Sequence, residues 1–151
     1  MKIIIKVVII SFLFFSCLPN KSSEVYSDKR MALFEKNSQK DINYIHELTI
    51  LNTSDFYVID EILKNAINDK EFYFLQRQNL KSLKKYYRQY VVYLNEKNEK
   101  CVYINAMCNV DIIPNWKNVL LDTSDGGSCY WNLKINLSKR IYQNLIVNGQ
   151  G

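Results

Sequence analysis

Residues 87–108, YRQYVVYLNEKNEKCVYINAMC, contain two runs of aromatic and β-branched residues separated by a polar segment. The runs are 87–95 and 100–108, and the residues EKNE between them have the length of a hairpin loop. Tyrosine, valine and isoleucine fit the pleated, half-buried surface of a sheet. This stretch therefore predicts an antiparallel β-hairpin.

Two more strands are predicted towards the C-terminus, at 129–137 (CYWNLKINL) and 141–148 (IYQNLIVN). The turn sequences TSDGGS and SKR precede them, and Gly126 and Gly127 supply the positive φ angles of a tight reversal. Pro114 interrupts any strand ladder in the segment after the hairpin, and the short apolar run VLLD follows it. The sequence thus predicts a meander of four or five antiparallel strands.

Residues 53–70 (TSDFYVIDEILKNAINDK) carry the clearest helical pattern. Apolar residues recur there at the spacing of one helix face: Phe56, Ile59, Ile62, Leu63, Ala66 and Ile67. Ser54 or Asp55 is placed to cap the helix N-terminus. Residues 28–52 allow a short helix starting at Met31 and a short strand in YIHELTI.

A helix and a sheet that are each apolar on one side bury those surfaces against each other. We therefore expect an α+β fold, with one main helix packed on a four- to five-stranded antiparallel sheet. Cystatin-like and NTF2-like curved sheets are the nearest known shapes, by analogy of element order alone.

The N-terminal sequence MKIIIKVVIISFLFFSC has the parts of a secretory signal peptide: Lys2 and Lys6, an apolar stretch, and Ser16 before Cys17. The apolar stretch is shorter than the roughly 20 residues that cross a bilayer. A small residue before a cysteine resembles the signal of bacterial lipoproteins, which implies that Cys17 is lipidated and becomes the first residue. The alternative is that Cys17 ends an ordinary signal peptide or a buried helix.

Lipidation at Cys17 sets the expected organisation of the chain. Residues 1–16 are then a lipoprotein signal peptide, 17–30 the lipidated cysteine and a polar tether, and 31–151 a single α+β domain. Without Lys2 and Lys6, 18 basic residues face 15 acidic ones, so the net charge falls from +5 to +3. This bias is too small to predict nucleic-acid binding.

Three cysteines remain in the predicted domain. Alternation along the strands places Cys108 and Cys129 on inward faces, where they either form a disulfide or serve as small buried hydrophobic residues. Cys101 has the opposite parity, so one free thiol is expected. A thiol nucleophile needs a base, and the single histidine, His46, lies far away in the sequence.

No catalytic, cofactor-binding or metal-binding constellation stands out. The sequence has no CxxC, HxH or HExxH spacing, and the DTSDGGS segment reads as a turn more readily than as a calcium or phosphate loop. The segment KSLKKYYRQY mixes lysine, arginine and tyrosine. It suggests an interaction surface at Tyr86, Arg88 and Tyr90, or simply a solvated positive face; behind a lipid anchor, anionic headgroups are an accessible partner.

The C-terminal half resembles small, functionally uncharacterised lipoproteins of Bacteroidetes. The resemblance rests on Tyr86–Tyr90 (YxRQY), Ile104–Cys108 (INxxC), Asp125–Tyr130 (DGGxCY) and the Asn-Gly pair at 148–149. It implies fold and location only. In Bacteroidetes-type lipoproteins an acidic cluster after the lipidated cysteine marks export to the cell surface, and its absence here favours the periplasmic side of the outer membrane.

The leading hypothesis is a non-enzymatic, membrane-anchored lipoprotein of the cell envelope whose domain binds another envelope protein or an incoming toxin. One alternative is a thiol-dependent or hydrolase-like envelope enzyme that uses Cys101 or Cys108. The other is a purely structural envelope module.

Overall fold

A computed structural model describes residues 28–35 and 47–149. The predictions for the signal peptide, for Cys17 and the tether up to residue 27, and for His46 lie outside these residues. Within the described residues the fold is α+β, with a six-stranded mixed sheet and two α-helices. The elements, in chain order, are β1 (Met31–Phe34), β2 (Glu47–Leu48), α1 (Thr53–Asn68), α2 (Leu80–Leu83), β3 (Tyr87–Leu94), β4 (Lys100–Met107), the 3₁₀ turn η1 (Gly127–Cys129), β5 (Tyr130–Asn136) and β6 (Ile141–Val147).

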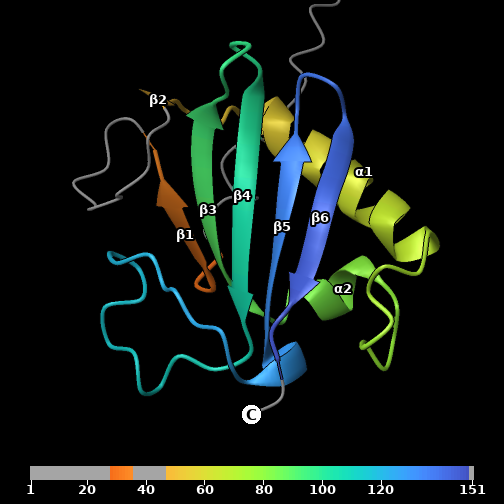
Figure 1. The fold of residues 1–151 in the computed structure, drawn as a ribbon, viewed down its shortest axis with the longest axis vertical. Helices are drawn as coiled ribbons and strands as arrows, with labels where there is room; N and C mark the ends of the chain where they lie inside the picture. The colour runs from red at the N-terminus through yellow and green to blue at the C-terminus, as the bar shows by residue number, and fades with distance from the viewer. Residues whose placement is uncertain (1–27, 36–46, 150–151) are drawn as a thin grey trace, which may run out of the picture.

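The strands β3, β4, β5 and β6 form an antiparallel meander, as the sequence predicts. In the first hairpin Tyr87 lies opposite Met107, and Leu94 lies opposite Lys100. In a meander every second loop lies at the same end of the sheet. The β3–β4 and β5–β6 loops therefore lie together, at the top of Figure 1, and α2 and η1 lie towards the other end.

The expectation of a purely antiparallel sheet is wrong. β1 joins β3 in parallel, with Met31 opposite Arg88, so the segment from Met31 starts a strand and not a helix. Alternate residues of β1 face two covered sides: Ala32 and Phe34 are buried on one, and Met31 packs against the core on the other. A four-residue strand that is covered on both faces shows no clear polar alternation, which is why its sequence is ambiguous. The VLLD run is not a strand.

Helix α1 covers one face of the sheet and lies behind it in Figure 1. The expected apolar stripe packs there against a strand face that includes Val92, Val102 and Ile104. The N-cap is Asn52, so the prediction of Ser54 or Asp55 at that position is wrong. Asp55 instead lies one turn in, where its carboxylate accepts a hydrogen bond from the Asn52 amide at 2.6 Å. Among the described residues, no helix is long and apolar enough to cross a membrane.

The other face of the sheet is partly covered by the connection 108–126, which links β4 to β5. Trp116 of this connection packs against Phe34 and Val91 in a second hydrophobic cluster. Below this layer lie Gln89 and Asn105, which face each other across β3 and β4 and are almost completely buried. Two buried polar side chains in a β-hairpin require partners, because an unsatisfied buried amide is costly.

Those partners are backbone groups of the connection itself. Gln89 Nε2 donates to the carbonyl oxygens of Trp116 and Val119, and Gln89 Oε1 accepts from the Leu121 amide at 3.0 Å and from Asn105 Nδ2 at 3.0 Å. Asn105 Nδ2 also donates to the Leu121 carbonyl at 2.7 Å. This amide pair therefore supplies the irregular connection with the hydrogen bonds that a neighbouring strand would otherwise supply.

Replacing Gln89 with leucine removes these bonds and leaves buried backbone groups without partners. We expect Gln89→Leu to lower the free energy of unfolding by about 1–3 kcal/mol, measured by urea denaturation followed by tryptophan fluorescence. The matched control is Gln143→Leu, at an exposed position of β6, with an expected change within about 0.5 kcal/mol. Equal midpoints for the two variants would show that the buried amide does not hold the connection.

Candidate binding site at the hairpin end

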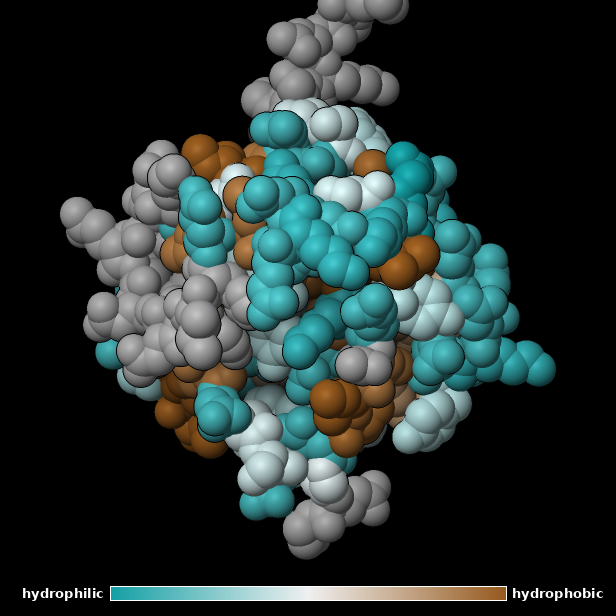
Figure 2. Space-filling view, turned by 45° about the horizontal axis from the view of Figure 1, so that its top comes forward, coloured by the Kyte–Doolittle hydropathy of each residue, from teal (hydrophilic) through white to brown (hydrophobic). Residues whose placement is uncertain are grey.

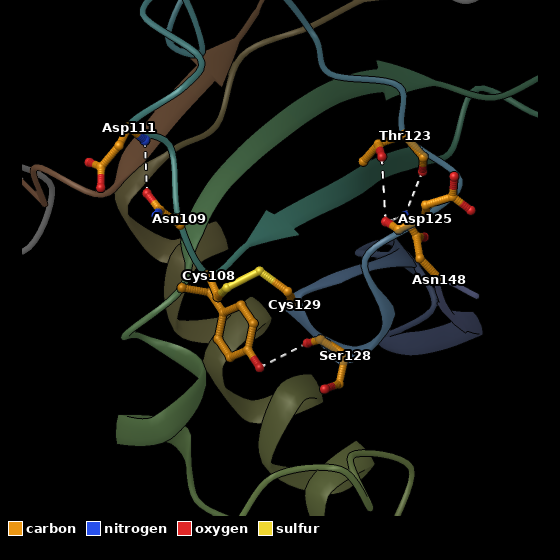
Figure 3. Close-up of a disulfide and its surroundings, with 9 residues drawn as sticks. Cys108, Asn109, Asp111, Thr123, Asp125, Ser128, Cys129 and Asn148 are labelled. Carbon is orange, nitrogen blue, oxygen red and sulfur yellow. Dashed lines mark hydrogen bonds between the residues drawn. A yellow bond between two sulfur atoms is a disulfide. The ribbon is translucent and has the colours of Figure 1, made fainter. Parts of the chain in front are cut away.

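Cys108 and Cys129 form a disulfide, with their Cα atoms 4.9 Å apart. The bond joins the end of β4 to η1 (Figure 3), and the Cys108 amide donates to the Cys129 carbonyl at 2.9 Å. Cys108 is exposed and Cys129 is half-buried, so the expectation that both point into the core is wrong. β4 ends at Met107 and Cys129 belongs to a 3₁₀ turn, so strand alternation does not extend to either residue.

The glycine turn next to the disulfide is locked by the C-terminal Asn-Gly pair. Gly126 and Gly127 both have positive φ, as the sequence predicts, and a Cβ atom on Gly126 would lie 2.5 Å from the Tyr130 ring. The Gly127 amide donates to the Gly149 carbonyl at 2.8 Å, and Asn148 Nδ2 donates to the Asp125 carbonyl at 3.2 Å.

The described residues contain no group of side chains that could hold a metal ion.

The prediction of an interaction surface at Tyr86, Arg88 and Tyr90 is wrong, because two of the three side chains are buried. Arg88 is 4% exposed and Tyr90 is 3% exposed, because alternate residues of this segment face the side that the helices cover. The Arg88 guanidinium pairs with Asp28 and donates to Tyr90 Oη, and burial raises the pKa of Tyr90. Only Tyr86 is partly accessible, and its hydroxyl donates to the Ser128 carbonyl at 3.0 Å.

A cavity of about 360 Å³ lies at the opposite end of the sheet, between the β3–β4 and β5–β6 loops. Tyr93, Cys101 and Asn136 form one cross-strand row of its wall, on the face of the sheet away from α1. The connection 108–126 covers the part of this face around Gln89 and leaves this end open. The other lining residues are Asn95, Glu96, Lys97, Glu99, Lys134, Ile135, Lys139 and Gln143. Figure 2, in which this end is turned forward, shows mostly hydrophilic residues there.

Glu99 is the electrostatic centre of the cavity. Its Oε2 accepts from Asn136 Nδ2 at 2.7 Å and from Asn95 Nδ2 at 2.9 Å, and its Oε1 lies 2.9 Å from Lys139 Nζ. The hydrogen bond from Lys139 and those from the two asparagines lower the pKa of Glu99 to about 2. Asn95 is itself fixed, because its Oδ1 accepts from the Lys97 and Glu99 amides. The carboxylate is therefore ionised and immobile, and it ties the two hairpin loops together.

Two further lysines line the cavity with their charges unmatched. Lys97 and Lys134 are exposed, and neither ammonium group has a hydrogen-bond or ion-pair partner among the residues that the structure describes. The described lining residues thus carry two carboxylates, the compensated Glu99 and the exposed Glu96, against three lysines, Lys97, Lys134 and Lys139, which leaves the cavity with a net positive charge. Such a preformed concave site with convergent polar groups suits the recognition of a polar, negatively charged group.

Cys101 lines the same cavity as a free, buried thiol. Burial and then the charge of Glu99 raise its pKa. Because the thiolate is the nucleophilic form of cysteine, both effects act against reactivity at neutral pH. The thiol-enzyme hypothesis gains no support from this geometry.

The sequence reasoning did not identify Glu99, Lys139 or the two asparagines. The signal for them is topological: the loop EKNE and the turn SKR are alternate connections of one meander, so they lie at the same end of the sheet. Asn95 directly precedes EKNE, and Asn136 lies two residues before SKR. A scan against protein-family models and searches of curated proteins and of solved structures find no match to this chain. Its function must therefore be argued from its own residues.

Thiol labelling tests the assignment of the cysteines. In the folded protein we expect iodoacetamide to label none of Cys101, Cys108 and Cys129, because one is buried and two are bonded to each other. After mild reduction Cys108 should react first, since it is exposed, whereas Cys101 should require unfolding. Peptide mass spectrometry measures each site. Labelling of Cys101 in the folded state, or of Cys108 before reduction, would contradict the assignment.

Glu99 makes stability depend on pH in a defined window. Its folded pKa of about 2 lies below the ordinary 4.5, so the ionised form stabilises the fold above pH 4.5, and this contribution is lost as the pH falls towards 2. We expect Glu99→Gln to be less stable than the wild type at neutral pH, with the difference shrinking between pH 4.5 and 2. Urea denaturation across this range measures it. A difference that stays constant with pH would refute the network around Glu99.

Proposed function

We propose that this chain is a lipoprotein of the cell envelope, anchored through Cys17 on the periplasmic side of the outer membrane, whose domain binds a partner protein at the hairpin-end cavity. The observation that carries the binding site is the fixed Glu99 carboxylate beside Lys97 and Lys134, two lysines without an ion-pair partner in the described part of the chain. A partner that presents a carboxylate beside a hydrogen-bond donor matches this arrangement of charges.

The disulfide supports the location. Disulfides persist in oxidising compartments such as the periplasm and are rare in the cytosol. Cys108 is exposed, so a reducing cytosol would have direct access to the Cys108–Cys129 bond. An extracytoplasmic location is therefore the one in which this end of the fold keeps its bond.

The motifs that this chain shares with Bacteroidetes lipoproteins contain residues that stabilise its fold. Gln89 and Asn105 hold the connection 108–126, and Gly126 and Asn148 shape the turn beside the disulfide. Each of the motifs YxRQY, INxxC, DGGxCY and Asn-Gly thus contains a residue that stabilises the connection or the turn. We infer that the shared pattern describes the architecture, whereas the cavity residues carry the binding specificity.

The proposal also includes the likeness of this fold to cystatin-like and NTF2-like domains. A single long helix, α1, against a curved antiparallel meander has the element order of cystatin-like and NTF2-like domains. We propose α1 as the main helix of such a layer, because α2 has only four residues. The parallel strand β1 is an addition to that pattern.

The anchor is tested by membrane fractionation. We expect wild-type protein to sediment with membranes and to yield an acylated N-terminal peptide that begins at Cys17, and the Cys17→Ser variant to lose the acylated peptide. Mass spectrometry of the membrane fraction measures both. Wild-type protein that is water-soluble and retains residues 1–16 would contradict the anchor.

The binding site is tested by photo-crosslinking in the cells that make the protein. A photoreactive residue at Gln143, in the cavity wall, should give a discrete adduct, and Lys97→Glu with Lys134→Glu should abolish it. The matched controls are a photoreactive residue and a charge reversal at Lys64, which is exposed on α1. Absence of an adduct at Gln143 would favour the purely structural module. An adduct that survives the double charge reversal would place the contact outside the lysines.

A further inference from the structure

A second, larger cavity lies at the α2 end of the domain and has a different chemistry. It encloses about 550 Å³ between the segment after α1, α2 and the disulfide. The lining residues are Phe74, Leu75, Gln76, Arg77, Ser82, Lys85, Tyr86 and Cys108. Arg77 and Lys85 are exposed cations, and none of the described residues that line the cavity carries a carboxylate.

The positive charge extends along the chain segment that forms this cavity. From Phe72 to Lys85 the sequence FYFLQRQNLKSLKK contains four basic residues and no acidic one. Lys84 is matched by Asp60, whose carboxylate lies 2.6 Å from the Lys84 ammonium group. Arg77, Lys81 and Lys85 are exposed and have no ion-pair partner in the described part of the chain. We refer to these three residues as the basic surface.

The same chain segment carries an exposed aromatic side chain. Tyr73 is 71% exposed and packs edge-to-face on Phe74, with ring centroids 5.7 Å apart. Tyrosine is enriched at the level of lipid headgroups, where its ring and hydroxyl meet different environments. The carboxylates of Asp111 and Asp125 lie near the disulfide (Figure 3) but do not line this cavity.

The tether enters the fold at this same end. Asp28, the first described residue, pairs with Arg88 at the start of β3, directly after the cavity residue Tyr86. Lys29 and Arg30, both exposed, follow it and add two more cations. The eleven peptide steps from Cys17 to Asp28 span at most about 40 Å. A chain anchored at Cys17 therefore keeps the α2 end close to the membrane.

We propose that the basic surface docks on the anionic headgroups of the membrane that holds the lipid anchor, with Tyr73 at the headgroup level. This inference rests on the proposed anchor at Cys17. Electrostatic attraction by a few cations is weak alone, but the tether supplies the high local concentration that it needs. Docking at the α2 end directs the hairpin-end cavity, at the other end of the sheet in Figure 1, away from the membrane and towards a partner.

Lysine acetylation of the full lipidated protein on vesicles tests this orientation. The protein is reconstituted on vesicles of phosphatidylcholine, alone or mixed with phosphatidylglycerol, and treated with a water-soluble acetylating reagent. We expect acetylation of Lys81 and Lys85 to be about fivefold lower on the mixed vesicles, and high salt to remove this protection. Lys97 and Lys134, at the cavity, serve as controls within the same chain and should react equally on both.

The possible outcomes separate this inference from the proposed function. Equal acetylation of Lys81 and Lys85 on both vesicles, with the protein still floating with the lipid, would overturn the docking surface and leave the anchor standing. Protein that floats with neither vesicle would overturn the anchor, and the docking surface with it. Protection that requires added envelope proteins and not phosphatidylglycerol would assign the surface to a protein partner and contradict the lipid proposal.

Discussion

The buried amide pair of Gln89 and Asn105 is the constraint on which the second face of this sheet depends. Gln89 and Asn105 lie opposite each other in β3 and β4. Their side chains form hydrogen bonds with the backbone of Trp116, Val119 and Leu121. An irregular segment can cover a sheet only if its own polar groups are satisfied. The pair meets that requirement for one half of the face, and the other half stays open as the hairpin-end cavity.

This division gives the domain two chemically different ends. At the hairpin end Glu99 is held ionised by Lys139 and two asparagines, in a small polar cavity. At the α2 end a disulfide joins the end of β4 to η1, next to a cavity whose described lining residues are cationic or neutral. The chain towards Cys17 enters at the α2 end. Under the proposed anchor at Cys17, this polarity gives the domain one end suited to a membrane and one end suited to a partner.

Much of the fold was predictable from residue patterns, and the elements that were not predictable have physical reasons for it. The hairpin 87–108 and the two later strands follow from runs of aromatic and β-branched residues separated by polar turns. The helix around Ile62 follows from helical spacing, because α1 buries one face. Strand β1 is covered on both faces and so shows no alternation. An arginine is usually expected on the surface, but Arg88 is buried because its guanidinium forms an ion pair with Asp28. The cavity depends on residues far apart in sequence, and only the meander topology brings them together.

Amide hydrogen exchange at Leu121 is the most direct test of the central role of the amide pair. Leu121 lies in an irregular connection, yet its amide donates to the buried Gln89 side chain. We predict that it exchanges as slowly as the amides of strand β4, and that Gln89→Leu makes its exchange fast without affecting that strand. Exchange of the wild-type Leu121 amide at the rate of an open loop would contradict the account.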